Sequence, residues 1–219
     1  MGKRIISQRR GRGTSTYKAH SHRWNIAINH RRYDEIEQEG SMSGVVKDLT
    51  HCAGHTAPIA IIKYDNGEYN YIFAPLGMKV GDRVNTGAKA EPTLGSTLAL
   101  RNIPEGTQIY NIETKPAGGG SLVRASGATA KLSTITEKGV LVIMPSRKQK
   151  LFNPECRATI GRIAGGGKKE KPFVKAGNKF HAMKAKGKLY PRTSGVAMNA
   201  VDHPFGSGRG RHAGKPLTA

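Results

Sequence analysis

Residues 58–73 read Pro58-Ile-Ala-Ile-Ile-Lys-Tyr-Asp-Asn-Gly-Glu-Tyr-Asn-Tyr-Ile-Phe73 and predict a β-hairpin. Two runs rich in β-branched and aromatic residues flank the pair Asn66-Gly67. Both residues of this pair tolerate a positive φ angle, which makes Asn-Gly the strongest short-range hairpin signal. The residues 44–49, Gly-Val-Val-Lys-Asp-Leu, are a plausible third strand beside the hairpin.

A second set of short β segments follows this hairpin along the chain. Each segment is bounded by a turn signal such as Lys138-Gly139 or Pro145-Ser146-Arg147, and such spacing favours small barrels. The 28 glycines and 11 prolines argue against a helical bundle, although one short helix near 96–101 or around 176–185 is compatible with the pattern. Residues 91–104 are expected to join two barrels. The expected strands of the second set are residues 108–113, 131–136, 140–144 and 148–152.

Membrane and secreted classes are not supported by the sequence. A membrane-spanning helix needs about 18 or more consecutive apolar residues, whereas Val140–Met144, one of the longest such runs, has five. The basic N-terminus is not followed by the apolar segment of a secretory signal. Cys52 and Cys156 are too few and too distant in sequence for a disulfide framework, which suggests a reducing cytosol.

Nearly all of the +21 net charge lies in the two ends of the chain. Residues 1–32 contain nine Lys and Arg and no acidic residue, and residues 161–219 contain 13 basic and two acidic residues, while the middle is almost balanced. The ends are also rich in Gly, Ser, Thr and His. They have too little apolar surface to offset the entropy of ordering, so we expect them to be largely disordered in isolation and to bind a polyanion.

The N-terminal arm combines forked guanidinium groups, hydroxyls and glycines between Arg9 and Arg23. Guanidinium groups bind phosphates bidentately, and glycine permits close backbone approach to a folded RNA. At about 3.3 Å per extended residue, the arm could reach roughly 100 Å. A solvated tail without a fixed partner is the alternative.

A second basic block runs from Gly165 to Lys188. A helix would place Lys171, Lys175 and Lys179 on one face, because they are spaced i, i+4 and i+8. Phe173 and Phe180 could stack on bases, but aromatic residues more often pack, so packing on the barrel is expected.

Three enzymatic or metal-binding patterns are weak. Neither Gly167-Lys168 nor Gly214-Lys215 satisfies the phosphate-loop pattern, since each fails at two positions. His51, Cys52 and His55, even with His20 and His22, lack the paired cysteines of a structural zinc site. Asp202-His203 could take part in proton transfer, but no nucleophile, second base or metal cluster accompanies it.

Several motifs together resemble one known family. They are Gln8-Arg-Arg-Gly-Arg-Gly-Thr-Ser-Thr16, Cys156-Arg-Ala-Thr-Ile-Gly161, Ala164-Gly-Gly-Gly-Lys168, Lys171-Pro-Phe-Val-Lys-Ala-Gly-Asn-Lys179 and Gly195-Val-Ala-Met-Asn-Ala-Val-Asp-His-Pro-Phe-Gly206. In this order they are similar to large-subunit ribosomal protein two in its archaeal form, over residues 2 to about 216. Two departures are Ser207, where the family usually has glycine, and the end at Ala219, where relatives usually continue with a basic tail.

The resemblance implies a mostly β fold: an oligonucleotide-binding-type barrel followed by an SH3-like barrel, with extended basic N- and C-terminal arms. The expected boundaries are 1–35 for the N-terminal arm, 36–88 and 89–164 for the barrels, and 165–219 for the C-terminal extension. The implied role is a cytoplasmic, non-enzymatic constituent of the large ribosomal subunit that binds its rRNA and supports subunit association, tRNA binding and assembly of the peptidyl-transferase region.

The implied partners are large-subunit rRNA, other ribosomal proteins, the small subunit at the subunit interface and, indirectly, tRNA, with no membrane. No cofactor is required by the sequence, and Mg²⁺ would be bound mainly by rRNA. A general nucleic-acid chaperone and an enzyme centred on Asp202 and His203 remain the alternatives. The expected RNA-contact residues are Arg9, Arg10, Arg12, Lys18, His20, His22, Arg23, Arg157, Lys168, Lys169, Lys175, Lys179, Lys184, Lys186, Arg192, Asn199, His203, Arg209, Arg211 and Lys215.

Overall fold

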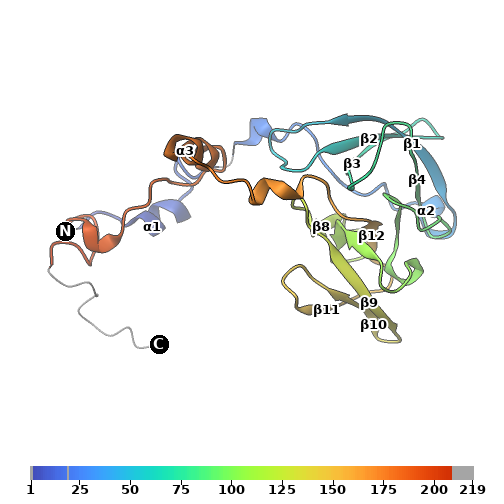
Figure 1. The fold of residues 1–219 in the computed structure, drawn as a ribbon. Coiled ribbons are helices and arrows are strands. Elements are labelled where there is room, and N and C mark those ends of the chain that lie inside the picture. The colour runs from blue at the N-terminus through green and yellow to red at the C-terminus, as the bar shows by residue number, and fades with distance from the viewer. Residues whose placement is uncertain (1, 19, 209–219) are drawn as a thin grey trace. The chain divides into compact units, whose positions relative to one another are not determined.

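The computed structural model describes residues 2–18 and 20–208 (Figure 1). His22–Lys171 form one compact unit, and the described residues up to Ser21 form a second unit with those from Pro172 onward. The first unit is mostly β. In this unit, ten strands form one sheet in the order β11-β10-β9-β6-β12-β5-β4-β1-β2-β3, and β7 pairs with β8.

The oligonucleotide-binding-type barrel occupies the first part of this unit. Asp34 caps the N-terminus of the short helix α2 (Glu35–Glu39): its carboxylate accepts a hydrogen bond from the backbone N–H of Glu37 at 3.1 Å. Antiparallel pairing joins β1 to both β2 and β4, and β2 to β3. The strands are β1 (Met42–Thr50), β2 (Ile59–Tyr64), β3 (Tyr69–Phe73) and β4 (Arg83–Thr86).

The hairpin predicted over residues 58–73 is confirmed as β2 and β3. Its connection differs from the expected Asn-Gly turn, because only Gly67 adopts a positive φ, at 87°. Asn66 instead accepts a hydrogen bond from the backbone N–H of Glu68 through its side-chain oxygen, at 3.0 Å. Asp65, Asn66 and Gly67 therefore form a three-residue loop with glycine at the left-handed position.

The SH3-like barrel contains the remaining strands. Two 3-10 turns accompany it: η2 (Leu100–Asn102) after its first strand and η3 (Gly166–Lys169) after its last. The strands are β5 (Thr97–Ala99), β6 (Gln108–Tyr110), β7 (Ile112–Glu113), β8 (Gly120–Leu122), β9 (Ala130–Thr136), β10 (Gly139–Ile143), β11 (Gln149–Phe152) and β12 (Arg157–Ile160).

Two expectations for this region need correction. The strand expected over 108–113 is divided at Asn111, which adopts a φ of 51° and so interrupts the extended backbone between β6 and β7. The segment 91–104 is more than a connection, since it contains β5, which pairs with β12 and meets β4 at Thr86 and Thr97. The division of the chain at residues 36, 89 and 165 stays a prediction.

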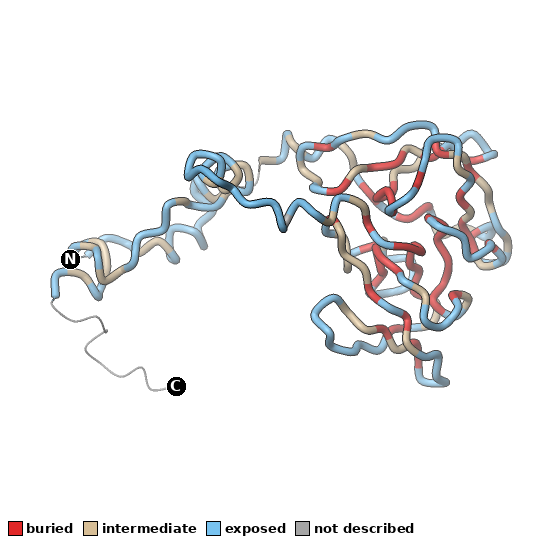
Figure 2. Tube along the Cα trace, viewed as in Figure 1, coloured by how far each residue is buried: buried red, intermediate tan, exposed pale blue. Residues whose placement is uncertain are grey.

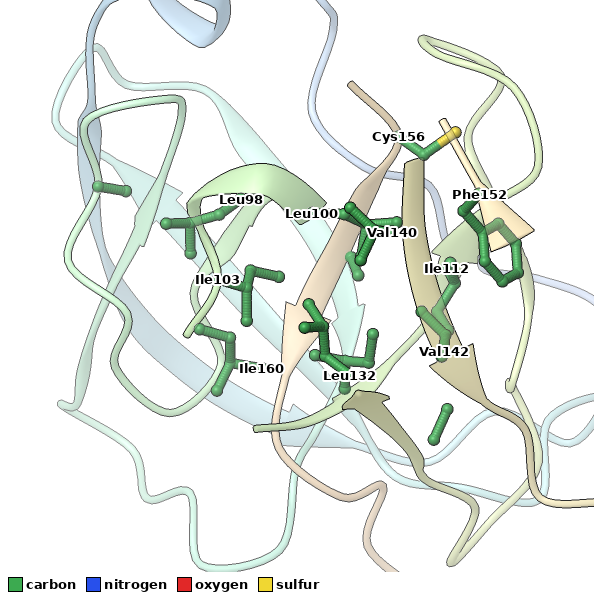
Figure 3. Packing of buried hydrophobic residues seen from close by; sticks show 14 residues of the cluster. Leu98, Leu100, Ile103, Ile112, Leu132, Val140, Val142, Phe152, Cys156 and Ile160 are labelled. Carbon is green, nitrogen blue, oxygen red and sulfur yellow. The ribbon is translucent and has the colours of Figure 1, made fainter. Parts of the chain in front are cut away.

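Successive side chains along the hairpin point alternately into two different cores. Ala60, Ile62 and Ile72 face the core of the first barrel, while Ile59 and Phe73 face a second cluster that also contains Tyr110 and Ile163. Because successive strand residues point to opposite faces, one hairpin contributes to both cores. Figure 3 shows the third and largest cluster, which fills the second barrel with Leu98, Leu100, Ile103, Ile109, Ile112, Leu132, Val140, Val142, Phe152, Cys156, Ala158 and Ile160.

Tyr110 connects the two barrels through a buried hydrogen bond. Its hydroxyl donates to the carbonyl of Phe73 at 2.7 Å, and burial raises the pKa of the phenol far above its usual value. We expect Tyr110→Phe to lower the free energy of unfolding by about 1–2 kcal/mol, because the buried carbonyl loses a donor. Urea denaturation measures the change. Tyr69→Phe, at an exposed position on β3, is the control and should leave stability unchanged.

Candidate nucleic-acid interface

The two chain ends that form the second unit have no core of their own. None of the described residues of this unit is buried, as Figure 2 shows by the absence of red along residues 2–18 and 172–208. They nevertheless contact each other: the backbone N–H of Lys3 donates to the carbonyl of Val201 at 2.7 Å, and His20 Nε2 donates to the carbonyl of Lys184 at 3.3 Å. The ends thus form a basic module whose side chains are accessible to an external partner.

Helix α1 (Ile6–Gly11) presents the arginines of the N-terminal arm. The side-chain oxygen of Gln8 accepts a hydrogen bond from the backbone N–H of Ile5 at 3.2 Å and so satisfies one free donor at the start of the helix. Arg9 and Arg10 lie in the last turn, where cations interact favourably with the helix dipole. Both are exposed, as is Arg12 directly after the helix.

Helix α3 (Ala176–Ala185) presents lysines of the C-terminal extension. It confirms the short helix that was compatible with the sequence around 176–185. A helix of this length is marginal in water without packing, and α3 has no buried residue, so an external partner would stabilise it. Lys175 precedes its first turn, Lys184 lies in its last turn, and Lys179 Nζ lies 5.1 Å from the ring centroid of Tyr190.

One expectation for this block is wrong. The helix begins at Ala176, so Lys171 does not share a helical face with Lys175 and Lys179; Pro172 disfavours helical backbone at residue 171. Phe173 and Phe180 are 44% and 42% exposed, and their packing on the barrel stays a prediction.

The loop around His203 is closed by backbone hydrogen bonds. The N–H groups of Asp202 and His203 both donate to the carbonyl of Asn199, at 2.9 and 3.1 Å. The His203 ring lies against Gly195, where a Cβ atom would come within 2.4 Å of it. Its Nδ1 accepts a hydrogen bond from the backbone N–H of Phe205 at 3.2 Å. In the neutral ring the proton is therefore on Nε2, which can donate to a phosphate or a base.

Asp202 and His203 are not arranged as an acid–base pair. The carboxylate of Asp202 pairs with Lys3 Nζ at 3.3 Å, while the Nδ1 that an orienting carboxylate would contact is occupied by the Phe205 N–H. The geometry thus favours a shaped contact loop over a proton-transfer pair. Within residues 2–18 and 20–208, no three His, Cys, Asp or Glu side chains gather to hold a metal ion.

Ser207 adopts a φ of 57°, a conformation that favours glycine. Its hydroxyl oxygen accepts a hydrogen bond from the backbone N–H of Ala200 at 3.1 Å, and its own N–H donates to the carbonyl of Met198. The side chain is thus turned back onto the loop. This placement accounts for a serine at a position where the resemblance led us to expect glycine.

We expect Ser207→Ala to accelerate hydrogen exchange at the Ala200 amide by about fivefold, because the strained backbone stays and the hydrogen bond, worth about 1 kcal/mol, is lost. Ser207→Gly loses the same hydrogen bond but relieves the strain, so the other amides of the loop should exchange more slowly than in Ser207→Ala. Amide exchange followed by NMR tests both. Equal exchange rates of the other loop amides in the two variants would show that the positive φ of Ser207 does not strain the loop.

Arg157 does not belong to the RNA-contact set. Its side chain is only 4% exposed, and its Nη2 pairs with Glu113 Oε1 at 2.9 Å while its Nη1 pairs with Glu37 Oε2 at 3.3 Å. Nη1 also donates to the carbonyl of Arg31 at 2.7 Å. The guanidinium lies 5.0 Å from the ring centroid of Tyr33. Its partners occupy it inside the protein, so a phosphate cannot reach it.

The remaining predicted contact residues are on the surface wherever their side chains are described. His20, Arg23, Lys179 and His203 are half-buried. The side chain of Lys169 is outside the described part, as are Arg209, Arg211 and Lys215. The exposed residues are Arg9, Arg10, Arg12, Lys18, His22, Lys168, Lys175, Lys184, Lys186, Arg192 and Asn199.

A hollow of about 680 Å³ on the first unit was not predicted from the sequence. Trp24 lines it and is 55% exposed. The edge-on ring of His55 lies 4.8 Å from Trp24, centroid to centroid, and Arg124 lies over Phe73. The position of Trp24, directly after Arg23 in the segment without acidic residues, was the available signal. Arg124, which comes from the second barrel, had no such signal.

Two family models together match almost the whole chain. The model described as Ribosomal Proteins L2, RNA binding N-terminal domain, matches residues 3–86, and the model described as Ribosomal Proteins L2, C-terminal domain, matches residues 93–219. The chain belongs to the ribosomal protein L2 family. Membership agrees with the two barrels in this order, and the family resemblance seen in the motifs is confirmed.

Curated relatives in the L2 family include archaeal proteins named large ribosomal subunit protein uL2. The protein of Methanothermobacter thermautotrophicus is 53% identical over 218 residues, that of Methanocaldococcus jannaschii is 52% identical over 218 residues, and that of Natronomonas pharaonis is 49% identical over 216 residues. These alignments cover 99–100% of this chain and 88–90% of the relatives. In the described residues, no helix is long and apolar enough to cross a membrane.

Proposed function

We propose that this protein is a structural constituent of the large ribosomal subunit that binds large-subunit rRNA. One observation carries the proposal: the chain contains a compact β unit with two barrels and also a separate basic module in which no described residue is buried. The barrels provide rigid surfaces, and the cations of the module replace counterions in crevices of the folded RNA.

The family and its named relatives support the place in the large subunit and the RNA binding. The finer roles extend the proposal. Through its RNA contacts the protein would help to assemble the peptidyl-transferase region, support association with the small subunit and contribute indirectly to tRNA binding. Its other partners would be neighbouring ribosomal proteins, and its location the cytoplasm. Peptidyl transfer is assigned to RNA, and Mg²⁺ would be bound mainly by rRNA, with no cofactor held by the protein.

A footprint tests the proposal against a general nucleic-acid chaperone. Hydroxyl-radical cleavage of large-subunit rRNA, with and without the protein, should show protection confined to one region of the RNA. An unrelated duplex of equal length is the control and should bind much more weakly. Equal protection of both nucleic acids would contradict a defined ribosomal site.

Reconstituted subunits test the enzymatic alternative. A His203→Ala protein that assembles normally should retain peptide transfer if the loop only contacts RNA. Normal assembly with abolished transfer would instead favour a chemical role for His203. Matched Asn199→Ala subunits, altered in the same loop but with the imidazole intact, show whether an effect belongs to the ring.

A further inference from the structure

The hollow beside Trp24 has the composition of a site for a flat, electron-rich ring. Its walls come from the segment 24–29, from the loop 54–56, from Phe73 on β3 and from Arg124. It has aromatic and cationic side chains but no acidic one. A polyanion can therefore approach without repulsion, and its bases find both stacking and cationic surfaces.

The indole of Trp24 contacts Gly54 and His55 on one part of its surface, and the rest of its surface is exposed to solvent. It rests on Gly54, where an added Cβ atom would lie 2.7 Å from Cδ2 and 2.9 Å from Cε3 of the ring. The ring of His55 meets it at an interplanar angle of 84°. Because more than half of the residue is exposed, a large aromatic surface is positioned but not covered.

Arg124 is positioned by its own hydrogen bonds. Its Nη1 donates to the carbonyl of Gly120 at 2.7 Å and its Nη2 to the carbonyl of Ile28 at 2.9 Å. The guanidinium carbon lies 5.3 Å from the ring centroid of Phe73. Burial, and then the charge of Arg124, lowers the pKa of His55, so this ring is neutral at pH 7. The positive charge of the hollow thus comes from the guanidinium of Arg124, which its hydrogen bonds hold in place.

We propose that this hollow binds one unpaired nucleobase of the ribosomal RNA, stacked on Trp24 beside Arg124. The proposal rests on the proposed function. The volume of about 680 Å³ falls within the roughly 300–1,000 Å³ typical of small-ligand sites and accommodates a single nucleotide. Asn29, exposed at the margin, offers an amide donor and an acceptor to the edge of the base.

Tryptophan fluorescence reports directly on this site, because Trp24 is the only tryptophan in the chain. A base stacked on the indole quenches its emission and shields it from acrylamide. Adding a transcript of the large-subunit rRNA to the full-length protein should therefore quench the emission at the same RNA concentration at which the complex forms on a filter. No peptide partner is present in this mixture, so quenching that follows complex formation depends on the RNA, and the base probing below assigns it to a nucleotide.

Two substitutions test the stacking surface. Trp24→Ala removes it and should weaken binding by about 5- to 150-fold, the change that corresponds to about 1–3 kcal/mol per stacked base. Gly54→Ala leaves Trp24 present but displaces it, and should reduce the quenching and weaken binding in the same direction. Tyr69→Ala, which removes a comparably exposed ring on β3, is the control and should change neither.

Base-specific chemical probing identifies the nucleotide. In the Trp24→Ala complex, one unpaired base should become reactive on its Watson–Crick edge while the rest of the footprint is retained. If wild-type protein binds the RNA but its emission is not quenched and no base changes reactivity in Trp24→Ala, the nucleobase site is refuted and the proposed function stands. If the wild-type protein gives no confined footprint at all, the proposed function itself fails.

Discussion

Replacing Arg157 by methionine should lower the free energy of unfolding by about 3–5 kcal/mol, the usual cost of removing one partner from a buried ion pair. The side chains of Glu37 and Glu113 are 0% exposed, and both pair with Arg157. Burial raises the pKa of Glu37, opposed by its hydrogen bond from Thr86 and by the charge of Arg157. Without the guanidinium, two buried carboxylates would lose their shared cation.

Urea denaturation of the full-length protein measures this effect, and Arg101→Met is the matched control. Arg101 pairs with Glu155 at the surface, where their side chains are 47% and 38% exposed, so its loss should cost under about 1 kcal/mol. Arg157→Lys keeps the charge but not the forked geometry and should fall between the two. If Arg157→Met unfolds at the same urea concentration as Arg101→Met, the buried network does not stabilise the fold.

The fate of Arg157 shows where sequence reasoning reaches its limit. Its neighbours in sequence, Cys156 and Ala158, belong to a motif that also suits RNA contact. Arg157 pairs inside the protein with the carboxylates of Glu113 and Glu37, which are 44 and 120 residues away in sequence. These carboxylates come close only because β12 joins the sheet between β5 and β6. No local pattern contains that pairing, so a buried arginine was read as a surface one.

The elements that were predicted correctly are those with local causes. Alternation and the loop at 65–67 specify β2 and β3 within 16 residues. The helix at 176–185 was only compatible with the sequence, because the basic residues there do not by themselves specify a helix. The short strands β5 and β12 were missed, because three or four residues carry too little periodicity. The exposure of most predicted contact residues followed from charge alone, whereas the hollow beside Trp24 depends on Arg124 from a different barrel.

Rising salt should release the protein from large-subunit rRNA steeply. If about 10 phosphates are neutralised, the logarithm of affinity falls with the logarithm of salt concentration at a slope of roughly −7 to −9, and affinity drops about 10⁴–10⁵-fold between about 50 and 200 mM salt. Replacing Arg9, Arg10 and Arg12 by glutamine should make the slope shallower by about 2–3, because each of these three arginines is exposed and can contact one phosphate. Filter binding over a series of salt concentrations gives the slope.

The control removes the same number of charges from the barrel surface. Lys138, Lys148 and Lys150 are exposed on the second barrel, and replacing all three by glutamine lowers the net charge equally. Their loss should change the slope by less than about 1, because long-range attraction between exposed charges is screened within about 10 Å at 0.1 M salt. Equal changes in both variants would mean that overall charge governs binding, as for a general nucleic-acid chaperone. A change confined to the N-terminal variant ties counterion release to Arg9, Arg10 and Arg12, which are exposed.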